Sequence, residues 1–102
     1  MTFDEFKSNV EQWAALRGIY RHSTPEAQLL KAMSELGELA DAHIKKDVPE
    51  KADGLVDTIV CLINYAYMEE IDMEKSMDDV WKILRVRQGR MVKGGAFVKD
   101  ES

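Results

Sequence analysis

Two carboxylates lie three residues apart at Glu35 and Glu38, and a second acidic group follows at Glu50, Asp53 and Asp57. Side chains three, four or seven positions apart share one face of a helix. If both segments are helical and pack side by side, the two acidic groups face each other across a helical hairpin. A carboxylate in such a place needs a cation, a proton or another partner. The spacing therefore predicts a site for a hard divalent cation.

Magnesium fits this prediction because it prefers oxygen ligands and keeps water and substrate phosphates among them, and manganese is the obvious substitute. A solvated helix surface is the other interpretation, since 19 of the 102 residues are Asp or Glu and acidic pairs are common on such surfaces. The apolar surroundings favour a functional site. Asp57 follows Val56 and precedes Ile59 in the most hydrophobic helix of the chain, where a solvated face is least expected.

Four helical segments are expected to position these carboxylates, because apolar residues recur at helical spacing and no stretch sustains the alternation of a β-strand. The predicted helices cover residues 2–17, 24–45, 49–70 and 72–88. Thr2, Thr24 and Asp72 stand where helix starts need capping side chains. We expect an all-α chain that forms a single domain over residues 1–102, with residues 90–102 as a loop or tail.

The second and third predicted helices should pack antiparallel, because their connection at about residues 46–48 is short. Counting outward from the centre of this connection places Glu38 level with Leu55 and Glu35 level with Thr58. The second acidic group then faces Glu35 and Glu38, and Glu50 lies about one turn nearer to the connection.

The third predicted helix is apolar on too many sides for one neighbour, which is typical of a helix buried between several partners. The fourth has apolar residues at core spacing, namely Met77, Val80, Trp81 and Leu84. Because 102 residues offer little else to cover these surfaces, we expect a four-helix bundle completed by homo-oligomerisation. The side chains expected at the contact between copies are Tyr65, Tyr67, Met68 and Ile71.

Charge and cysteine content exclude several classes of protein. The net charge is −5, whereas a general nucleic-acid binder carries an excess of Lys and Arg, so we expect no nucleic-acid partner. The single Cys61 lies in an apolar run and is expected to be a small buried hydrophobe in a reducing compartment. The sequence shows no leader pattern and no uninterrupted apolar span, so we expect a cytoplasmic protein without a membrane partner.

Three groups of residues resemble motifs of one enzyme family: Trp13 with Arg17-Gly18, Gln28-Leu-Leu-Lys31 with Glu35-Leu-Gly-Glu38-Leu-Ala, and Arg85, Arg87 and Arg90 with Gly95-Ala-Phe97-Val98-Lys99. The combination resembles the MazG-like nucleotide pyrophosphohydrolases, and most closely their short single-domain members from phages and bacteria. The similarity spans nearly the whole chain, and the combination is more specific than any one motif.

The resemblance implies a hydrolase that cleaves a ribo- or deoxyribonucleoside triphosphate between its α and β phosphates, releasing a monophosphate and pyrophosphate. It also implies a homodimer or homotetramer with the site near the contact between subunits. Magnesium or manganese would be held by the carboxylates and would activate a water molecule. Glu35 or Glu38 is then the candidate catalytic residue that orients or deprotonates this water.

The family pattern is Glu-x-x-Glu, a spacer and Glu-x-x-Asp, and this chain departs from it. Matching a downstream asparagine makes Asp57 the final aspartate, but Gly54 then stands in place of the glutamate. The literal match is Glu50 with Asp53. We favour Asp57 as a metal ligand beside the first pair, with Asp53 substituting for the missing glutamate. Glu50 is either an outer ligand or a residue that complements the helix dipole.

Several other residues are candidates for substrate binding. Lys31 either reaches a phosphate or forms an ion pair with Glu35. Asn64 either hydrogen-bonds the nucleotide, as the resemblance implies, or links helices as a buried amide. Trp13 and Trp81 are candidates for stacking on a base, although their spacing also suits the core. The basic residues expected to clamp the phosphates, in the site of a neighbouring subunit, are Arg87, Arg90 and Lys99.

Two other functions stay open. A non-catalytic helical nucleotide sensor or adaptor would keep the fold and the metal site without turnover, and Gly54 in place of a glutamate keeps this alternative open. A phosphoribosyl-ATP pyrophosphohydrolase would share the acidic hairpin, but Arg17-Gly18 and Phe97-Val98-Lys99 fit the MazG-like pattern better.

Overall fold

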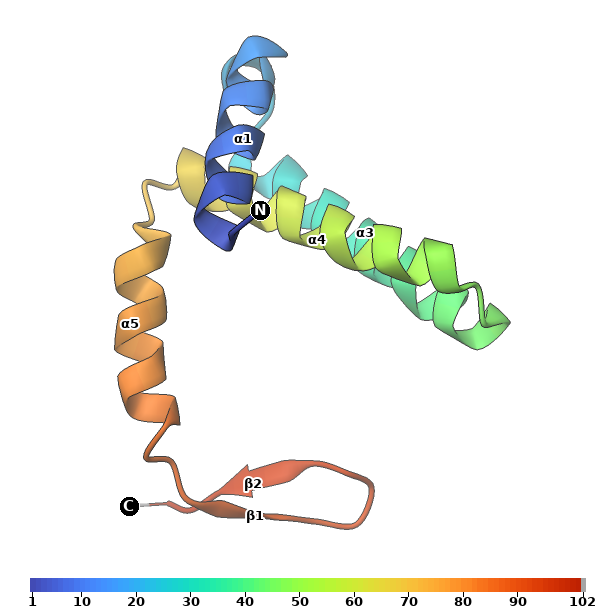
Figure 1. Ribbon diagram of the computed structural model, residues 1–102, viewed down its shortest axis with the longest axis vertical. Coiled ribbons are helices and arrows are strands. Elements are labelled where there is room, and N and C mark those ends of the chain that lie inside the picture. Colours follow the sequence, from blue (N-terminus) through green and yellow to red (C-terminus); the bar gives the residue numbers. More distant parts are fainter. Residues whose placement is uncertain (102) are drawn as a thin grey trace. The chain divides into compact units, whose positions relative to one another are not determined.

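The computed structural model describes residues 1–101. Its contacts divide the chain into two units, Met1–Ile71 and the residues from Asp72 on. Each unit is described by itself. Across residues 1–101 there are five helices and one two-stranded sheet (Figure 1). The prediction of a mainly helical chain is therefore confirmed, whereas the helix count and the absence of strands are corrected.

The first unit consists of α1 (Phe3–Leu16), α2 (Ile19–His22), α3 (Pro25–Lys45) and α4 (Val48–Met68). Thr2 caps α1, because its hydroxyl accepts from the Glu5 N–H while the Glu5 carboxylate accepts from the Thr2 N–H, which is the predicted capping box. The hydroxyl of Thr24 caps α3 in the same way through the Ala27 N–H. Only the short helix α2 was not predicted, since four residues are too few to show a period.

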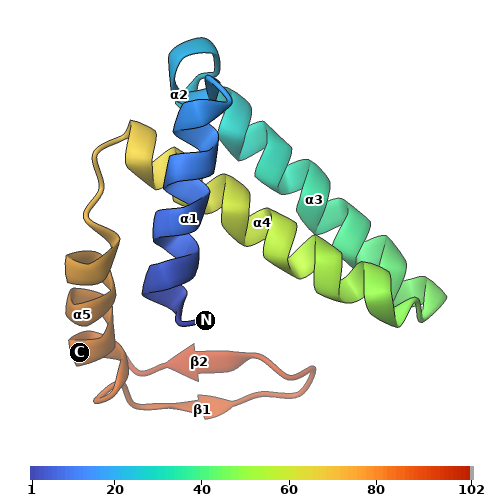
Figure 2. The same ribbon diagram turned by 45° about the horizontal axis from the view of Figure 1, so that its top comes forward.

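Helices α3 and α4 form an antiparallel hairpin, and α1 packs across α4 (Figures 1 and 2). The hairpin closes through Lys46, in the left-handed conformation, and Asp47, which caps α4. Gly54 lies directly against Leu39, where a Cβ on the glycine would be 3.1 Å from the Leu39 Cα. Residues 39 and 54 are therefore level, which confirms the register predicted from the connection.

The core of the first unit is small, and its fully buried large side chain is Ile63. Within the first unit, α4 is not buried on several sides as expected. Its apolar side chains Leu55, Val56, Leu62 and Tyr67 are between 41% and 52% exposed, because the described part of the first unit supplies only α1 and α3 as its main neighbours.

The second unit contains α5 (Met73–Leu84), β1 (Gly89–Met91) and β2 (Phe97–Lys99). Asp72 caps α5 as predicted, through the Lys75 N–H. The helix ends at Leu84 rather than near residue 88, because the chain then becomes extended and pairs with itself. The two strands are antiparallel, with Arg90 opposite Val98. The predicted loop or tail at residues 90–102 is thus corrected to a β-hairpin over 89–99.

A glycine pair makes this hairpin possible. Gly94 and Gly95 have φ angles of 101° and 93°, a left-handed conformation that only glycine adopts at little cost. The Val92 N–H donates to the Ala96 carbonyl oxygen across the turn. The sequence prediction took the glycine pair as a sign of a loop, whereas two consecutive left-handed residues also suit a tight hairpin.

Helix α5 has no buried side chain in the described part of the second unit. The residues expected in a core are exposed, with Val80 at 60% and Trp81 at 59%. The spacing therefore predicted the helix correctly but not its burial. Among the described residues, no helix combines the length and the apolar character needed to cross a membrane.

Candidate functional site

A carboxylate cluster lies between α3 and α4, and we define it as Glu35, Glu38 and Asp57 with Lys31 as its neighbouring cation. Glu35 is buried, at 9% exposure, and its Oε1 lies 3.5 Å from the Lys31 Nζ. The ion pair that was one of two predicted roles for Lys31 is thus present. Burial of an acid with a single, exposed lysine leaves its negative charge incompletely balanced.

Glu38 shares a hydrogen bond with Glu35, and this bond raises the pKa of Glu38 above its ordinary value. The negative charges of Glu35 and, more weakly, of Asp57 act in the same direction, while Lys31 opposes them. Negative charges nearby disfavour the ionised form of a carboxyl group. Glu38 therefore holds its proton more tightly than an isolated glutamate does.

Cys61 lies near this cluster on α4. Its thiol is buried, as predicted, and burial followed by the charge of Glu35 raises its pKa. A thiol with a raised pKa stays protonated and is a poor nucleophile. Cys61 is therefore a buried, protonated thiol close enough to Glu35 to feel its charge.

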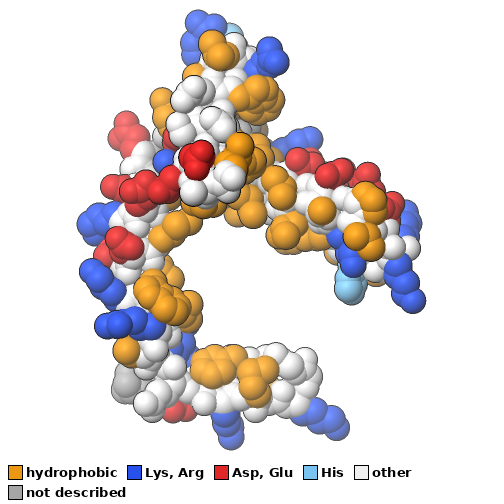
Figure 3. Space-filling model, in the orientation of Figure 1, with side chains coloured by type: hydrophobic (Ala, Val, Ile, Leu, Met, Phe, Trp, Pro, Cys, Tyr) orange, Lys and Arg blue, Asp and Glu red, His pale blue; other side chains and the backbone are white. Residues whose placement is uncertain are grey.

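The other two predicted acidic ligands lie outside the cluster. Glu50 lines a shallow hollow nearer to the hairpin connection, together with Glu38, Asp41, Ala42, Lys45 and Asp47. Asp53 is exposed. Acidic side chains gather along one edge of the α3–α4 hairpin and hydrophobic ones along the opposite edge (Figure 3).

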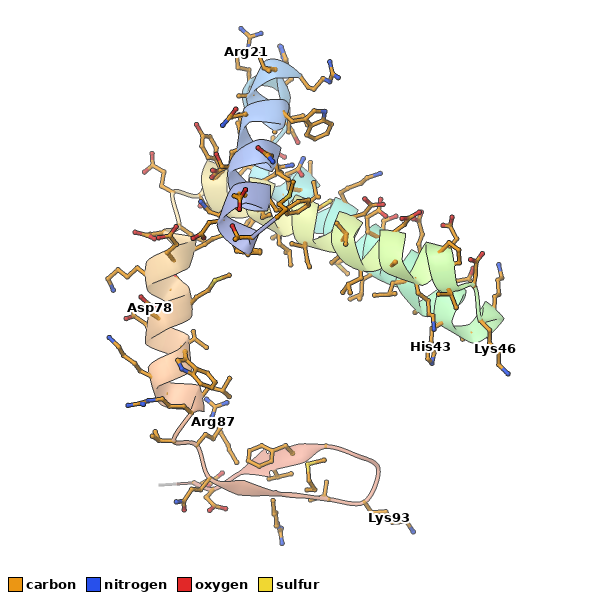
Figure 4. All side chains as sticks on the ribbon, in the orientation of Figure 1. Arg21, His43, Lys46, Asp78, Arg87 and Lys93 are labelled. Carbon is orange, nitrogen blue, oxygen red and sulfur yellow. The ribbon has the colours of Figure 1, made fainter. Side chains whose placement is uncertain are left out.

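The described residues contain no group of three His, Cys, Asp or Glu side chains already arranged to hold a metal ion. The chemistry of the donors nevertheless suits a hard cation, because Glu35, Glu38 and Asp57 supply oxygens from two helices beside one lysine. Histidine does not contribute, since His43 points away from the acidic edge (Figure 4). Binding of a cation would replace the proton on Glu38 as the source of positive charge.

An apolar groove between α1 and α4 leads to the cluster. Its lining consists of Phe6, Asn9, Val10 and Trp13 from α1, with Val56, Asp57 and Val60 from α4. Trp13 is 46% exposed, so it is available to a ligand rather than enclosed in the core. Asp57 belongs to both the groove and the cluster, and a planar apolar group in the groove would therefore lie beside the carboxylates.

Asn64 is 2% exposed, and its Oδ1 accepts a hydrogen bond of 2.8 Å from the Tyr20 hydroxyl. The Tyr20 ring stacks on Tyr67 at a centroid distance of 4.0 Å, and burial raises the pKa of Tyr20 to about 12. This arrangement matches the buried amide that was one of two interpretations of Asn64. Sequence reasoning missed Tyr20, because its helix is a single turn and shows no periodic pattern.

The basic residues of the second unit are divided between two faces of the β-hairpin. Arg87 and Lys99 line one hollow, whose other residues are Ile83, Val86, Gln88, Asp100 and Glu101. Arg90 is opposite Val98, one position along from the Gly89–Lys99 pair, so it projects from the other face of the ribbon. The hairpin brings together two of the three predicted phosphate ligands.

The chain is similar to one protein of a bacterial virus. It is 36% identical over 64 residues to an uncharacterized 18.2 kDa protein in the rep-hol intergenic region of Haemophilus phage HP1. The match covers 63% of this chain but only 39% of the phage protein. No protein-family model matches the chain, and no solved structure matches it. The similarity is therefore to part of a longer phage protein.

Proposed function

We propose that this protein is a metal-dependent nucleoside triphosphate pyrophosphohydrolase, which cleaves the triphosphate to a monophosphate and pyrophosphate. The observation that carries the proposal is the carboxylate cluster, in which Glu35 is buried beside Lys31 and raises the pKa of the neighbouring Glu38. A purely structural hairpin gains nothing from this arrangement, because carboxylates brought together in the absence of a cation repel each other. A site that binds Mg²⁺ and phosphates explains why they are brought together.

The residues that would hold Mg²⁺ or Mn²⁺ are Glu35, Glu38 and Asp57, with Asp53 and Glu50 as outer ligands. When bound, such an ion neutralises phosphate charge and lowers the pKa of a water molecule. The chain supplies the proton acceptor. Glu38 is exposed and has a raised pKa, which suits a carboxylate that takes a proton from water. Lys31 is within reach of a phosphate once its bond to Glu35 is released.

The nucleoside part of the substrate would lie in the groove between α1 and α4. Trp13 and Phe6 provide apolar surface for a base, and Asn9 provides an amide donor and acceptor. Because Asp57 lines the same groove, a base placed there leaves its phosphates close to the cluster.

The enzyme would work in the cytoplasm as a homodimer or homotetramer. The α3–α4 hairpin carries an exposed apolar face, which consists of Leu29, Met33, Leu36, Ile44, Val48, Leu55 and Leu62. A monomer rarely leaves so much contiguous apolar surface in water. In such an assembly the basic residues Arg87, Arg90 and Lys99 would reach the phosphates in a neighbouring subunit's site.

The test is to measure monophosphate and pyrophosphate release from a panel of ribo- and deoxyribonucleoside triphosphates with Mg²⁺, with Mn²⁺ or with chelator. The proposal expects both products in equal amounts, and only when metal is present. Release of inorganic phosphate in place of pyrophosphate, or release that continues in chelator, would contradict it.

A nucleotide sensor without turnover is the second candidate, and the packing of Gly54 against Leu39 favours it, since a carboxylate side chain at this position would meet the Leu39 backbone. Binding of triphosphates without any product, measured by calorimetry with Mg²⁺, would select the sensor. Neither binding nor release would reject both candidates.

A further inference from the structure

Helix α5 carries an apolar stripe that the described part of its own unit leaves uncovered. Met73, Met77, Val80 and Leu84 recur at the spacing of one helix face, and Trp81 lies beside them. Met77, Val80 and Leu84 are 46%, 60% and 48% exposed. A helix of 12 residues is marginal in water without a partner for its apolar face. The stripe therefore needs an occupant.

The charges along α5 identify that occupant. Residues 72–79 contain four acidic side chains and one basic side chain, whereas residues 80–85, up to the C-cap of the helix, contain two basic side chains and no acidic one. Asp78 lies in the acidic half (Figure 4). The two halves carry net charges of opposite sign. A surface of this kind is complementary to itself when one copy is turned end over end.

We propose that α5 is a contact between two copies of this chain and that the two α5 helices pack antiparallel about a twofold axis. In this orientation the stripe pairs Met73 with Leu84 and Met77 with Val80 of the second copy. The acidic half of each helix then lies beside the basic half of the other, and the helix dipoles oppose each other. A parallel pair would set like charges side by side.

One ion pair distinguishes this arrangement. Glu74 and Arg85 project from the same flank of the stripe at opposite ends of the helix, 11 positions apart, so they cannot touch within one helix. In the antiparallel pair, Arg85 of each copy lies beside Glu74 of the other, and the contact occurs twice. The proposal rests on the homo-oligomer proposed above but not on its hydrolytic activity.

The experiment compares full-length Glu74→Arg, full-length Arg85→Glu and their equimolar mixture by sedimentation equilibrium. In a dimer of either variant alone, like charges meet at both of the contacts between residues 74 and 85. We therefore expect self-association to weaken about tenfold. The mixture forms a heterodimer in which both ion pairs are restored, so its association should return to the wild-type strength. Lys93→Glu, at the tip of the β-hairpin, makes the same change of charge as Arg85→Glu and should leave association unaltered.

Three outcomes overturn the proposal. A wild-type chain that stays monomeric at about 0.1 mM, where even a weak complex forms, would reject both the homo-oligomer and this contact. Single variants that associate as tightly as the wild type would reject the α5 contact alone. A mixture that associates no better than its components would reject the antiparallel pairing. Because the measured quantity is mass, none of these outcomes depends on whether triphosphates are hydrolysed.

Discussion

At the scale of single residues, the proximity of Glu35 and Glu38 is the most informative feature. A buried carboxyl group lies beside an exposed one, and this neighbour raises the pKa of Glu38 above its ordinary value. The cation that we propose for this site would compete with the proton on Glu38. The three predictions at this scale test the site.

The first prediction concerns the loss of single charges. Glu38→Gln and Asp57→Asn each remove one carboxylate with little change in shape, and we expect each to lower the rate of pyrophosphate release by about 100-fold or more. Helicity by circular dichroism should stay at the wild-type level. Asp41→Asn is the matched control, because Asp41 is an exposed acid of the same hairpin that pairs with Lys45 at 2.8 Å. Full activity in both cluster variants would contradict the assignment.

Glu50→Gln separates the two ways of aligning the acidic motif. Glu50 lines a hollow toward the connection together with Glu38 but without Glu35 or Asp57, so we expect a loss smaller than that of Asp57→Asn in the same assay. A loss as deep as that of Asp57→Asn would favour the literal motif formed by Glu50 and Asp53.

The third prediction concerns pH and the metal-free protein. The pKa of Glu38 is raised above 4.5 by its bond to Glu35, so the folded state binds this proton more tightly than the unfolded state does. The proton on Glu38 stabilises the folded state fully at pH values below the ordinary pKa of 4.5. This stabilisation is lost as the pH rises through the raised pKa of the folded state. Urea unfolding in chelator should therefore show the free energy of unfolding decreasing with pH above 4.5, and Glu38→Gln should remove that decrease. Equal slopes for the two proteins would contradict the raised pKa of Glu38.

The acidic residues were accessible to sequence reasoning because helical spacing alone puts Glu35 and Glu38 on one face and Asp57 opposite them. The same reasoning could not decide the role of Asn64. Its partner Tyr20 lies 44 positions away on a single turn of helix, and a contact between segments that distant leaves no periodic trace in the sequence. Helical spacing also could not separate Asp57 from Asp53 and Glu50, because it does not show which residues of α3 each of them faces.

At the scale of elements, the hairpin depends on the close approach of α3 and α4 at Gly54. We predict that Gly54→Ala lowers the free energy of unfolding by about 1–3 kcal/mol, because the new methyl group would press on the Leu39 backbone. Gly37→Ala is the control, since Gly37 is helical and exposed with no neighbour within 4 Å of an added Cβ. It should stabilise by about 0.5–1 kcal/mol. Urea unfolding measures both, and equal effects of the two substitutions would contradict the close contact.

Capping residues and the short connection made the helices and the register of the hairpin predictable, because each of these signals is local. The β-hairpin over residues 89–99 was not predictable in the same way. Its strands are three residues long, too short to show an alternation, and its turn residues also suit an open loop.

At the scale of the whole molecule, the exposed apolar face of α3–α4 predicts a stability that depends on protein concentration. Association stabilises the folded state by mass action, so the Tm of the wild type should rise with concentration. Leu36→Lys and Leu55→Lys should weaken this dependence, because each places a charge on a side chain that is 55% or 52% exposed in the single chain. Ser34→Lys, at an exposed position of α3, is the control. A Tm independent of concentration would contradict the assembly.

Apolar spacing alone could not predict which of the helical side chains are buried. The spacing correctly predicted helices that the structure places at Val48–Met68 and Met73–Leu84, but it cannot distinguish a face that is covered by the same chain from one that is covered by another copy. Leu55 and Trp81 occupy core positions by spacing, and each is exposed.

The contact between Gly54 and Leu39 also constrains how this sequence can diverge. Replacing Gly54 by glutamate would complete the acidic pattern Glu-x-x-Asp in a single step, yet the new side chain would have to occupy the space of the Leu39 backbone. The gain in the motif and the loss in packing are thus tied to one position. A lineage that acquires the glutamate has to shift α3 and α4 slightly apart at this point, so substitutions that loosen the contact at Leu39 should accompany it.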